Sequence, residues 1–264
     1  MFRTRFSHDI VSEYLPPKDV YAYMKAVAQG KKATPPKQSP RKVVIIMKGA
    51  PSTPGAPELL EYFSNKGYWA FQPRYRGCWE SGGVFLAKSH HHDVLDVIAG
   101  IEQGFEDSWS KQMTRIPIAS IHLVGASFGG PAVLMASHHP LVEKVIALSP
   151  VVDWSHPSNS KPFEAMHAYA VHAFGNGYRW TKNVVEKLKK GTLYNPVHST
   201  NLIVSEKVCI FHADDDTVVL SAPVKEFAKE MGIRMVTHKK GGHYGVSSLL
   251  VPRVLKGVEA FLGI

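Results

Sequence analysis

The sequence predicts an α/β fold with a mostly parallel central sheet and helices on both of its faces. Two observations lead to this prediction: short apolar segments of strand length alternate with amphipathic helical segments, and glycine-rich turns follow several of the strands. Such alternation is typical of parallel sheets, because the chain must cross over, usually through a helix, between parallel strands. The chain has 264 residues, of which 44% are hydrophobic, so we expect a single domain over residues 1–264.

Residues 1–40 predict short leading strands followed by a loop. Apolar stretches at Phe2–Ile10 and Val20–Val27 alternate with polar residues, which favours extended structure. The segment Thr34–Pro40 is rich in proline and polar residues. We therefore expect a turn or an exposed loop there.

The regular alternation begins after residue 40. Short apolar runs predict strands at Val43–Met47, Tyr68–Phe71, Ile118–Val124, Val145–Leu148, Val208–Phe211 and Ile233–Val236. Helical spacing of apolar residues predicts helices at Pro57–Lys66, Asp93–Glu102, Gly130–His138, Thr181–Lys190 and near the C-terminus. Residues 151–200, rich in aromatic residues, histidine and proline, interrupt the alternation. An insertion of this length is typical of a helical cap over the ligand site at the carboxyl ends of the strands.

Charge and hydropathy exclude several classes of function. The net charge of +9 comes from 31 Lys and Arg against 22 Asp and Glu, but lysine pairs such as Lys31–Lys32 and Lys239–Lys240 lie far apart, without interleaved aromatic residues. We therefore expect no nucleic-acid partner.

The longest apolar runs have only the length of core strands, so we expect no membrane span. Polar residues, including His8–Asp9, stand where a signal peptide would be apolar, and the expected location is the cytoplasm.

No cofactor or metal is expected. Cys78 and Cys209 cannot by themselves form a four-ligand zinc site. The run His90–Asp93 contains three adjacent histidines, but consecutive residues on a helix point in different directions. Their imidazoles therefore cannot all converge on one ion.

Ser127 is the candidate nucleophile. The segment Gly125–Gly130 reads Gly-Ala-Ser-Phe-Gly-Gly and lies between a predicted strand and a predicted helix. In this context Gly-x-Ser-x-Gly is typical of a strained turn that small neighbours permit and that projects the serine Oγ above the sheet.

A serine hydroxyl needs a base, and the base needs an acid that orients it. Both residue types follow Ser127 in the required order, each after a predicted strand. The acids are Asp214, Asp215 and Asp216, and the histidine is His243, which follows two glycines. The three neighbouring aspartates point in different directions, so only one of them should reach the histidine.

The segment His212–Val219 resembles the His-Gly-x-x-Asp-x-x-Val segment of many α/β-hydrolases, and this resemblance implies that Asp216 is the catalytic acid. More narrowly, the chain resembles the catalytic domain of the prolyl oligopeptidase family and its stand-alone esterase relatives over residues 41–262. The segments that carry this resemblance are Lys48–Pro51, Pro73–Gly77, Gly125–Gly130, Leu148–Trp154 and Gly241–His243. The resemblance implies the α/β-hydrolase fold and serine hydrolysis without a cofactor.

The chain departs from this family pattern in two ways. The family's His-Gly-Gly-Pro or Tyr-x-Gly-Pro segment here begins with Lys48, so no tyrosine hydroxyl can contribute to the oxyanion hole. Backbone donors can still form the hole: the amide of Phe128 and one amide from Gly49 or Ala50. The second departure is that residues 1–40 are too few for the N-terminal propeller that the family's peptidases usually carry, which weakens the expectation of peptidase activity.

The expected function is hydrolysis of small carboxylic esters, with Ser127 as the nucleophile, His243 as the base and Asp216 as the acid. Cleavage of short peptides or acyl-amides is the first alternative, and ligand binding without turnover is the second. The aromatic and histidine residues of and near the insertion could line an acyl pocket or form the cap's own core. They are Trp79, Trp154, His167, His172, Phe174, Tyr178 and Trp180.

Overall fold

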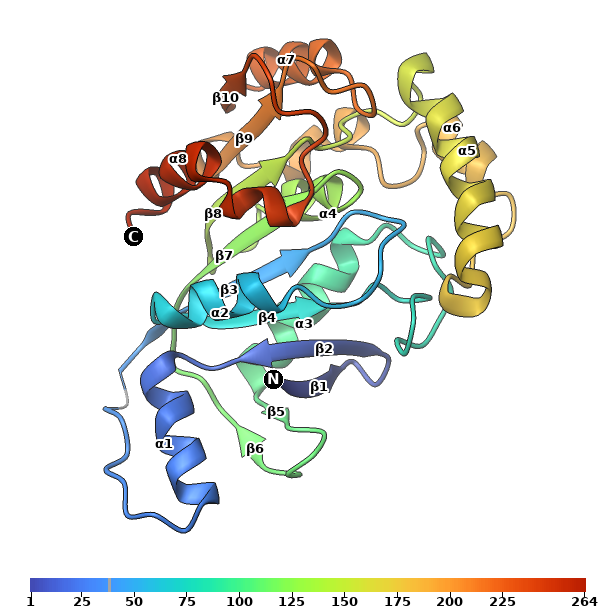
Figure 1. Ribbon diagram of the computed structural model, residues 1–264. Helices are drawn as coiled ribbons and strands as arrows, with labels where there is room; N and C mark the ends of the chain where they lie inside the picture. The colour runs from blue at the N-terminus through green and yellow to red at the C-terminus, as the bar shows by residue number, and fades with distance from the viewer. Residues whose placement is uncertain (38) are drawn as a thin grey trace.

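The computed structural model describes residues 1–37 and 39–264, apart from the side chains of residues 159–162. Its main feature is an eight-stranded sheet with the order β1-β2-β4-β3-β7-β8-β9-β10 (Figure 1). The strands are β1 (Phe2–Phe6), β2 (Ile10–Leu15), β3 (Arg41–Met47), β4 (Trp69–Pro73), β7 (Ile118–Ala126), β8 (Val142–Leu148), β9 (Val208–Ala213) and β10 (Arg234–His238). Strands β4, β3, β7, β8, β9 and β10 are parallel to one another. The hairpin of β1 and β2 pairs antiparallel with β4. The prediction of a mostly parallel sheet is confirmed.

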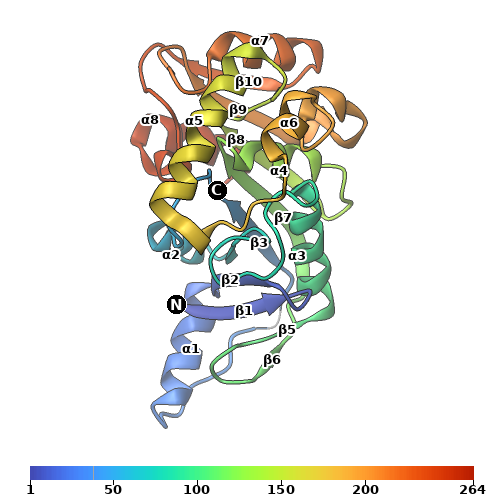
Figure 2. The same ribbon diagram turned by 90° about the vertical axis from the view of Figure 1, so that its right-hand side faces the viewer.

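The described residues form helices on both faces of this sheet and beyond its edges (Figure 2). These helices are α1 (Lys18–Ala28), α2 (Pro57–Asn65), α3 (His91–Gln103), α4 (Gly129–Met135), α5 (Pro157–Phe174), α6 (Val184–Lys189), α7 (Ser221–Glu230) and α8 (Pro252–Leu262). A small ribbon of β5 (Phe105–Glu106) and β6 (Met113–Thr114) lies apart from the main sheet. In the described part of the chain, no helix combines the length and the apolar character that a membrane span requires.

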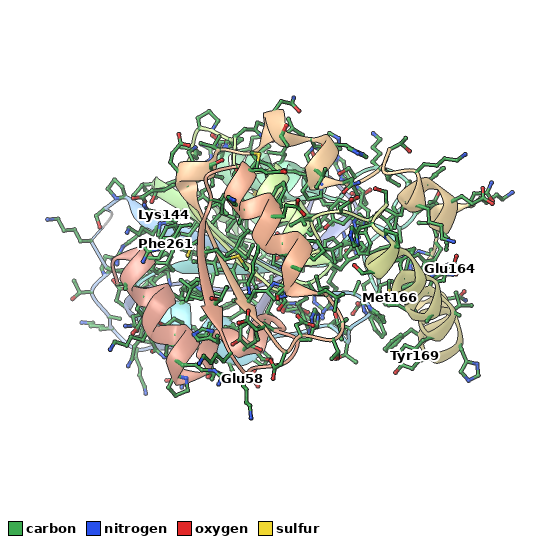
Figure 3. All side chains as sticks on the ribbon, turned by 90° about the horizontal axis from the view of Figure 1, so that it is seen from above. Glu58, Lys144, Glu164, Met166, Tyr169 and Phe261 are labelled. Carbon is green, nitrogen blue, oxygen red and sulfur yellow. The ribbon has the colours of Figure 1, made fainter. Side chains whose placement is uncertain are left out.

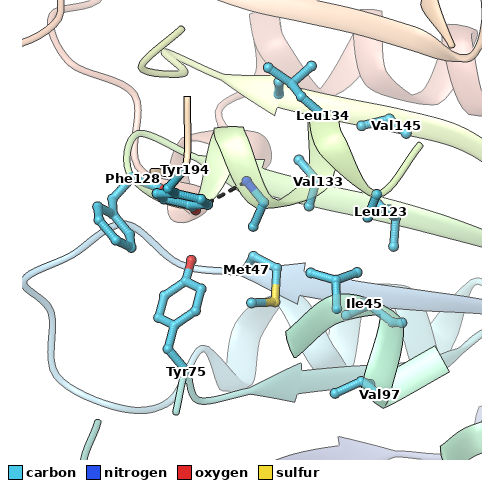
Figure 4. Close-up of a cluster of buried hydrophobic side chains, with 14 of the residues drawn as sticks. Ile45, Met47, Tyr75, Val97, Leu123, Phe128, Val133, Leu134, Val145 and Tyr194 are labelled. Atoms are coloured by element: carbon cyan, nitrogen blue, oxygen red, sulfur yellow. Dashed lines mark hydrogen bonds between the residues drawn. The ribbon is translucent and has the colours of Figure 1, made fainter. Parts of the chain in front are cut away.

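Alternation along the central strands explains the two layers of helices. On β3, Val43, Ile45 and Met47 belong to the core shared with α3, α4 and α7, whereas Val44 and Ile46 belong to the core shared with α2 and α8. Successive side chains of a strand point to opposite faces, so a strand that is apolar throughout requires cover on both sides. Figure 4 shows the first of these cores, where Ile45 and Met47 meet Leu123 and Val133.

The N-terminal segment differs in part from the prediction. Within Phe2–Ile10, the chain forms β1 and then turns into β2, which begins at Ile10. Val20–Val27, however, lies in α1 and is not a strand. Its apolar residues Val20, Met24 and Val27 recur at helical spacing, and Pro17 precedes the first turn as the N-cap. The loop expected at Thr34–Pro40 includes Gln38, which lies outside the described residues.

Parallel strands bring their carboxyl ends to one edge of the sheet, and the candidate residues follow these ends. Lys48 follows β3, Ser127 follows β7 and the aspartates follow β9, while His243 comes five residues after the last residue of β10, His238. Helices α5 and α6, from the 151–200 segment, lie beyond this edge, and Figure 2 shows them in front of it. The predicted helix Thr181–Lys190 begins later, at Val184, because Asn183 has a left-handed backbone with φ 56°.

Candidate active site

Ser127 lies in a tight turn between β7 and α4. Its φ is 51°, in the left-handed region that residues with a Cβ rarely adopt. The turn is held by the Ser127 N–H, which donates to the Leu148 carbonyl at 2.8 Å, and by the Ser127 carbonyl, which accepts from the Gly130 N–H at 3.0 Å. This strained backbone is what the sequence motif between strand and helix predicts.

Three glycines leave room for this turn. A Cβ on Gly129 would lie 2.3 Å from the Met47 carbonyl oxygen, and a Cβ on Gly125 would lie 2.4 Å from the Gly129 oxygen. A Cβ on Gly130 would lie 2.3 Å from the Pro150 Cβ. Because two of the three obstacles are backbone atoms, a larger residue could enter only if a strand or the helix shifted.

Replacing Gly129 with Ala should therefore destabilise the protein by about 1–3 kcal/mol, the usual cost of forcing atoms into a packed site. Gly245→Ala is the matched control, since a Cβ there meets nothing within 4 Å. The free energy of unfolding from urea titrations measures both variants. Equal stability of the two variants would contradict the steric account of the turn.

The three neighbouring aspartates have different partners. Asp214 pairs with Lys225 at 2.7 Å, and Asp215 Oδ1 accepts from the backbone N–H groups of Gly241 and Gly242, each at 2.8 Å. Asp215 thus holds the loop that carries the histidine by accepting from its backbone amides. Asp216 Oδ2 accepts from His243 Nδ1 at 2.9 Å. Of the three aspartates, Asp216 is the one that contacts the His243 imidazole.

Backbone N–H groups and the His212 ring also contact the Asp216 carboxylate. Its Oδ1 accepts from the N–H groups of Val218 and Val219 at 2.9 and 3.0 Å, and its Oδ2 lies 3.4 Å from His212 Nε2. Burial would raise the pKa of Asp216, but the hydrogen bonds from His212, His243 and Val219 outweigh it and hold the pKa well below its usual range. The carboxylate is therefore ionised at neutral pH.

His212 has a defined tautomer. Its Nε2 lies 2.9 Å from the Val219 carbonyl, which can only accept, so Nε2 carries the proton. Its Nδ1 is buried without a partner among the described residues. The His212 side chain is fully buried, so its contact with Asp216 Oδ2 helps to fix the position of the carboxylate.

The histidine loop and the serine turn are anchored at the same strand. The Tyr244 N–H donates to Ser149 Oγ at 3.1 Å, directly after the end of β8, where Leu148 holds Ser127. Among the described residues no hydrogen bond joins Ser127 Oγ to His243. Such bonds are often long in free enzymes and tighten only when substrate binds.

The residues proposed for the oxyanion hole surround Ser127. Gly49 packs against it so closely that a Cβ on Gly49 would lie 3.3 Å from the Ser127 Cβ. Ala50 and Phe128 line the same cavity as Ser127. The buried Tyr194 secures this turn, because its OH donates to the Phe128 carbonyl and accepts from the Ala132 N–H at 3.1 Å (Figure 4).

An apolar cavity of about 60 Å³ opens beside Ser127. Its described lining residues are Ala50, Ser127, Phe128, Val151, Trp154, Phe163, Met166, Val218 and Val219. Phe163 and Met166 come from α5, and Figure 3 shows Met166 on the side of that helix that faces the body of the protein. Sequence reasoning missed these two, because helical spacing alone does not reveal which face meets the serine.

Most of the aromatic residues of the insertion pack with one another and do not line this cavity. Of the candidates only Trp154 lines it. Trp180 stacks on Tyr178 with ring centroids 5.6 Å apart and meets His167 at 4.6 Å, while Trp79 meets Phe174 at 5.7 Å. His172 is exposed. Tyr178 belongs to the main core, and Trp79, Phe174 and Trp180 pack against it, so these side chains join the insertion to the body of the protein.

The histidine run at the start of α3 has structural contacts. His90 Nδ1 lies 2.7 Å from Asp93 Oδ2, and Asp93 also pairs with Arg76 at 2.7 Å. In the part of the chain that the structure describes, no group of three or more His, Cys, Asp or Glu side chains is placed to hold a metal ion. Cys78 and Cys209 are both free and buried.

A serine on a strand-to-helix turn, followed along the chain by an acid and a histidine at later strand ends, defines the class of α/β-hydrolases. Solved structures share this fold. An esterase of Pyrococcus furiosus superposes with a TM-score of 0.63 at 18% identity, over 86% of this chain and 83% of the esterase. Est1E from Butyrivibrio proteoclasticus, solved with ferulic acid, gives 0.62 at 16% identity over 100% of both chains.

A third similar structure is the acylaminoacyl peptidase of Pyrococcus horikoshii, with a TM-score of 0.63 at 14% identity; the match covers 99% of this chain but 40% of the peptidase. The profile of the prolyl oligopeptidase family matches residues 57–262. The chain therefore belongs to the prolyl oligopeptidase family and is a hydrolase of the group that contains these esterases and peptidases. No curated protein matches the sequence.

Proposed function

We propose that this chain hydrolyses small carboxylic esters through an acyl-enzyme on Ser127. His243 takes the Ser127 proton while Oγ attacks the ester carbonyl, and the Asp216 carboxylate stabilises the imidazolium that forms. His243 then returns the proton to the leaving alcohol as the tetrahedral intermediate collapses. Water, activated by the same imidazole, attacks the acyl-enzyme and releases the carboxylic acid and the free serine.

The proposed oxyanion hole consists of backbone N–H groups. The Phe128 amide and one amide from Gly49 or Ala50 would donate to the negative oxygen of the tetrahedral intermediate. The close packing of Gly49 against Ser127 supports this assignment, because a donor on this segment lies next to the attacking atom. Donors held by the backbone need little reorganisation when charge develops.

The observation that carries the proposal is the apolar cavity beside Ser127. Its described lining offers no charged side chain, so an uncharged acyl group fits it better than the charged end of a peptide. The volume of about 60 Å³ is well below the roughly 150 Å³ of a cavity that admits benzene. We therefore propose a short aliphatic acyl group, with residues 151–200 acting as the cap that closes over it.

Acyl-chain length tests this proposal. Among p-nitrophenyl esters, kcat/KM for butyrate should exceed that for decanoate about tenfold, since surplus carbons cannot be buried. Met166→Ala should extend the preference by several carbons, and Tyr169→Ala, on the exposed side of the same helix, should not. An unchanged chain-length profile in Met166→Ala would contradict the assigned pocket.

Cleavage of short peptides or acyl-amides is the second candidate, favoured by membership of a family named for a peptidase. Comparing p-nitrophenyl esters with aminoacyl-naphthylamides separates the two. A kcat/KM for the amides above that for the esters would replace the esterase proposal by the peptidase one. Saturable ligand binding without turnover of either would favour the non-catalytic alternative.

A further inference from the structure

Lys48 stands where the family pattern has histidine or tyrosine, and its side chain has defined partners. It follows β3 and is half-buried. Its Nζ donates to the Thr53 carbonyl at 2.7 Å and to the Gly55 carbonyl at 2.8 Å. The ammonium therefore ties the start of the 48–55 loop to its end. Because the group is partly withdrawn from water, burial lowers the pKa of Lys48.

The same loop is also held from outside. Tyr75 OH donates to the Lys48 carbonyl at 2.6 Å, the Ser52 N–H donates to Tyr178 OH at 2.8 Å, and Trp79 Nε1 donates to the Ser52 carbonyl at 3.1 Å. These contacts reach the base and the tip of the loop. The Lys48 ammonium instead bridges the loop from within, through its hydrogen bonds to the Thr53 and Gly55 carbonyls.

The loop carries the proposed oxyanion donors Gly49 and Ala50. Gly49 packs directly on Ser127, and Ala50 lines the cavity beside it. Hydrogen bonds from an ammonium to carbonyls are charge-assisted and about twice as strong as neutral ones. Two of the three Lys48 donors are committed to loop carbonyls, so the side chain acts on the site through the backbone.

We propose that Lys48 is a positioning residue of the oxyanion hole: its ammonium sets the 48–55 loop so that the Gly49 or Ala50 amide faces the reacting carbonyl. This proposal rests on the proposed ester hydrolysis at Ser127. In this chain, a lysine that hydrogen-bonds to two carbonyls of its own loop takes the place of the histidine or tyrosine of the family pattern.

Steady-state kinetics on p-nitrophenyl butyrate test the proposal with Lys48→Met, Lys48→Arg and the control Lys66→Met. Lys66 pairs with Glu259 on the surface, away from the loop. Lys48→Met should lower kcat by about 10- to 100-fold with KM within about twofold, because a displaced donor weakens only transition-state binding. Lys48→Arg keeps a charged donor and should recover most of the loss. Lys66→Met should match the wild type.

A trifluoromethyl ketone forms a tetrahedral oxyanion on the serine. Its inhibition constant therefore reports on the oxyanion hole itself and separates loss of the hole from a general loss of stability. Its Ki in Lys48→Met should rise by the factor by which kcat/KM falls. A kcat within twofold of the wild type would overturn the proposal. So would a fall in kcat that arginine does not rescue and that a matching fall in Tm accompanies.

Hydrogen exchange keeps this proposal separate from the proposed function. The backbone amides of Gly49, Ala50, Ser52, Thr53 and Gly55 should exchange at least tenfold faster in Lys48→Met than in the wild type, whether or not a substrate is known. If wild-type protein hydrolyses no ester and no probe labels Ser127, ester hydrolysis fails as the function. If the loop exchanges equally in both proteins, Lys48 does not hold it, and the present inference fails by itself.

Discussion

Ser127→Ala is expected to lower kcat for p-nitrophenyl butyrate by about 10⁴- to 10⁶-fold, because removing the nucleophile of such a site abolishes the acyl-enzyme route. The fold should persist, since alanine fits the same backbone and removes only one oxygen. The urea midpoint of unfolding should therefore stay close to that of the wild type. Any residual rate would reflect binding and the oxyanion donors alone.

A fluorophosphonate probe gives the direct measurement. It should label the native protein at Ser127, as located by peptide mass spectrometry, and should leave Ser127→Ala unlabelled. Ser120→Ala is the matched control, because Ser120 lies on the same strand but its Oγ donates to Glu143 on the surface. Equal labelling of Ser127→Ala and the wild type would contradict the assignment of the nucleophile.

Asp216→Asn is expected to lower kcat by about 10³- to 10⁴-fold while the protein stays folded. An amide can still accept from Val218 and Val219, but it no longer stabilises the imidazolium and it favours the wrong tautomer of His243. Kinetics on the same ester at pH 8 measure the effect. KM should change little, because Asp216 acts on the transition state and not on the bound ester.

The neighbouring aspartates provide the controls for this variant. Asp214→Asn loses only the pair with Lys225 and should keep nearly full activity. Asp215→Asn weakens the hold on Gly241 and Gly242 and should cost about tenfold through misplacement of His243. If Asp214→Asn lost as much activity as Asp216→Asn, the acid would have to be reassigned.

Local patterns were sufficient for most of the fold. Val43–Met47 was predicted as a strand because a short apolar run bounded by polar and glycine residues has few other solutions. Val20–Val27 was predicted wrongly, since apolar spacing in so short a segment fits both strand and helix. There the neighbouring Pro17 and the solvent-facing position of α1 decided the outcome.

The sequence by itself determined the parallel α/β sheet and the order of the candidate serine, acids and histidine along the chain, because periodicity and turn chemistry depend on near neighbours. Its resemblance to a known family implied the α/β-hydrolase fold and the family. Only the tertiary structure decided that Asp216 meets His243 while Asp215 holds its loop, that Met166 faces the serine, and that Lys48 turns to the carbonyls of Thr53 and Gly55. The direction of a side chain and its partners depend on segments far apart in the sequence, which meet only when the strands align at one edge of the sheet.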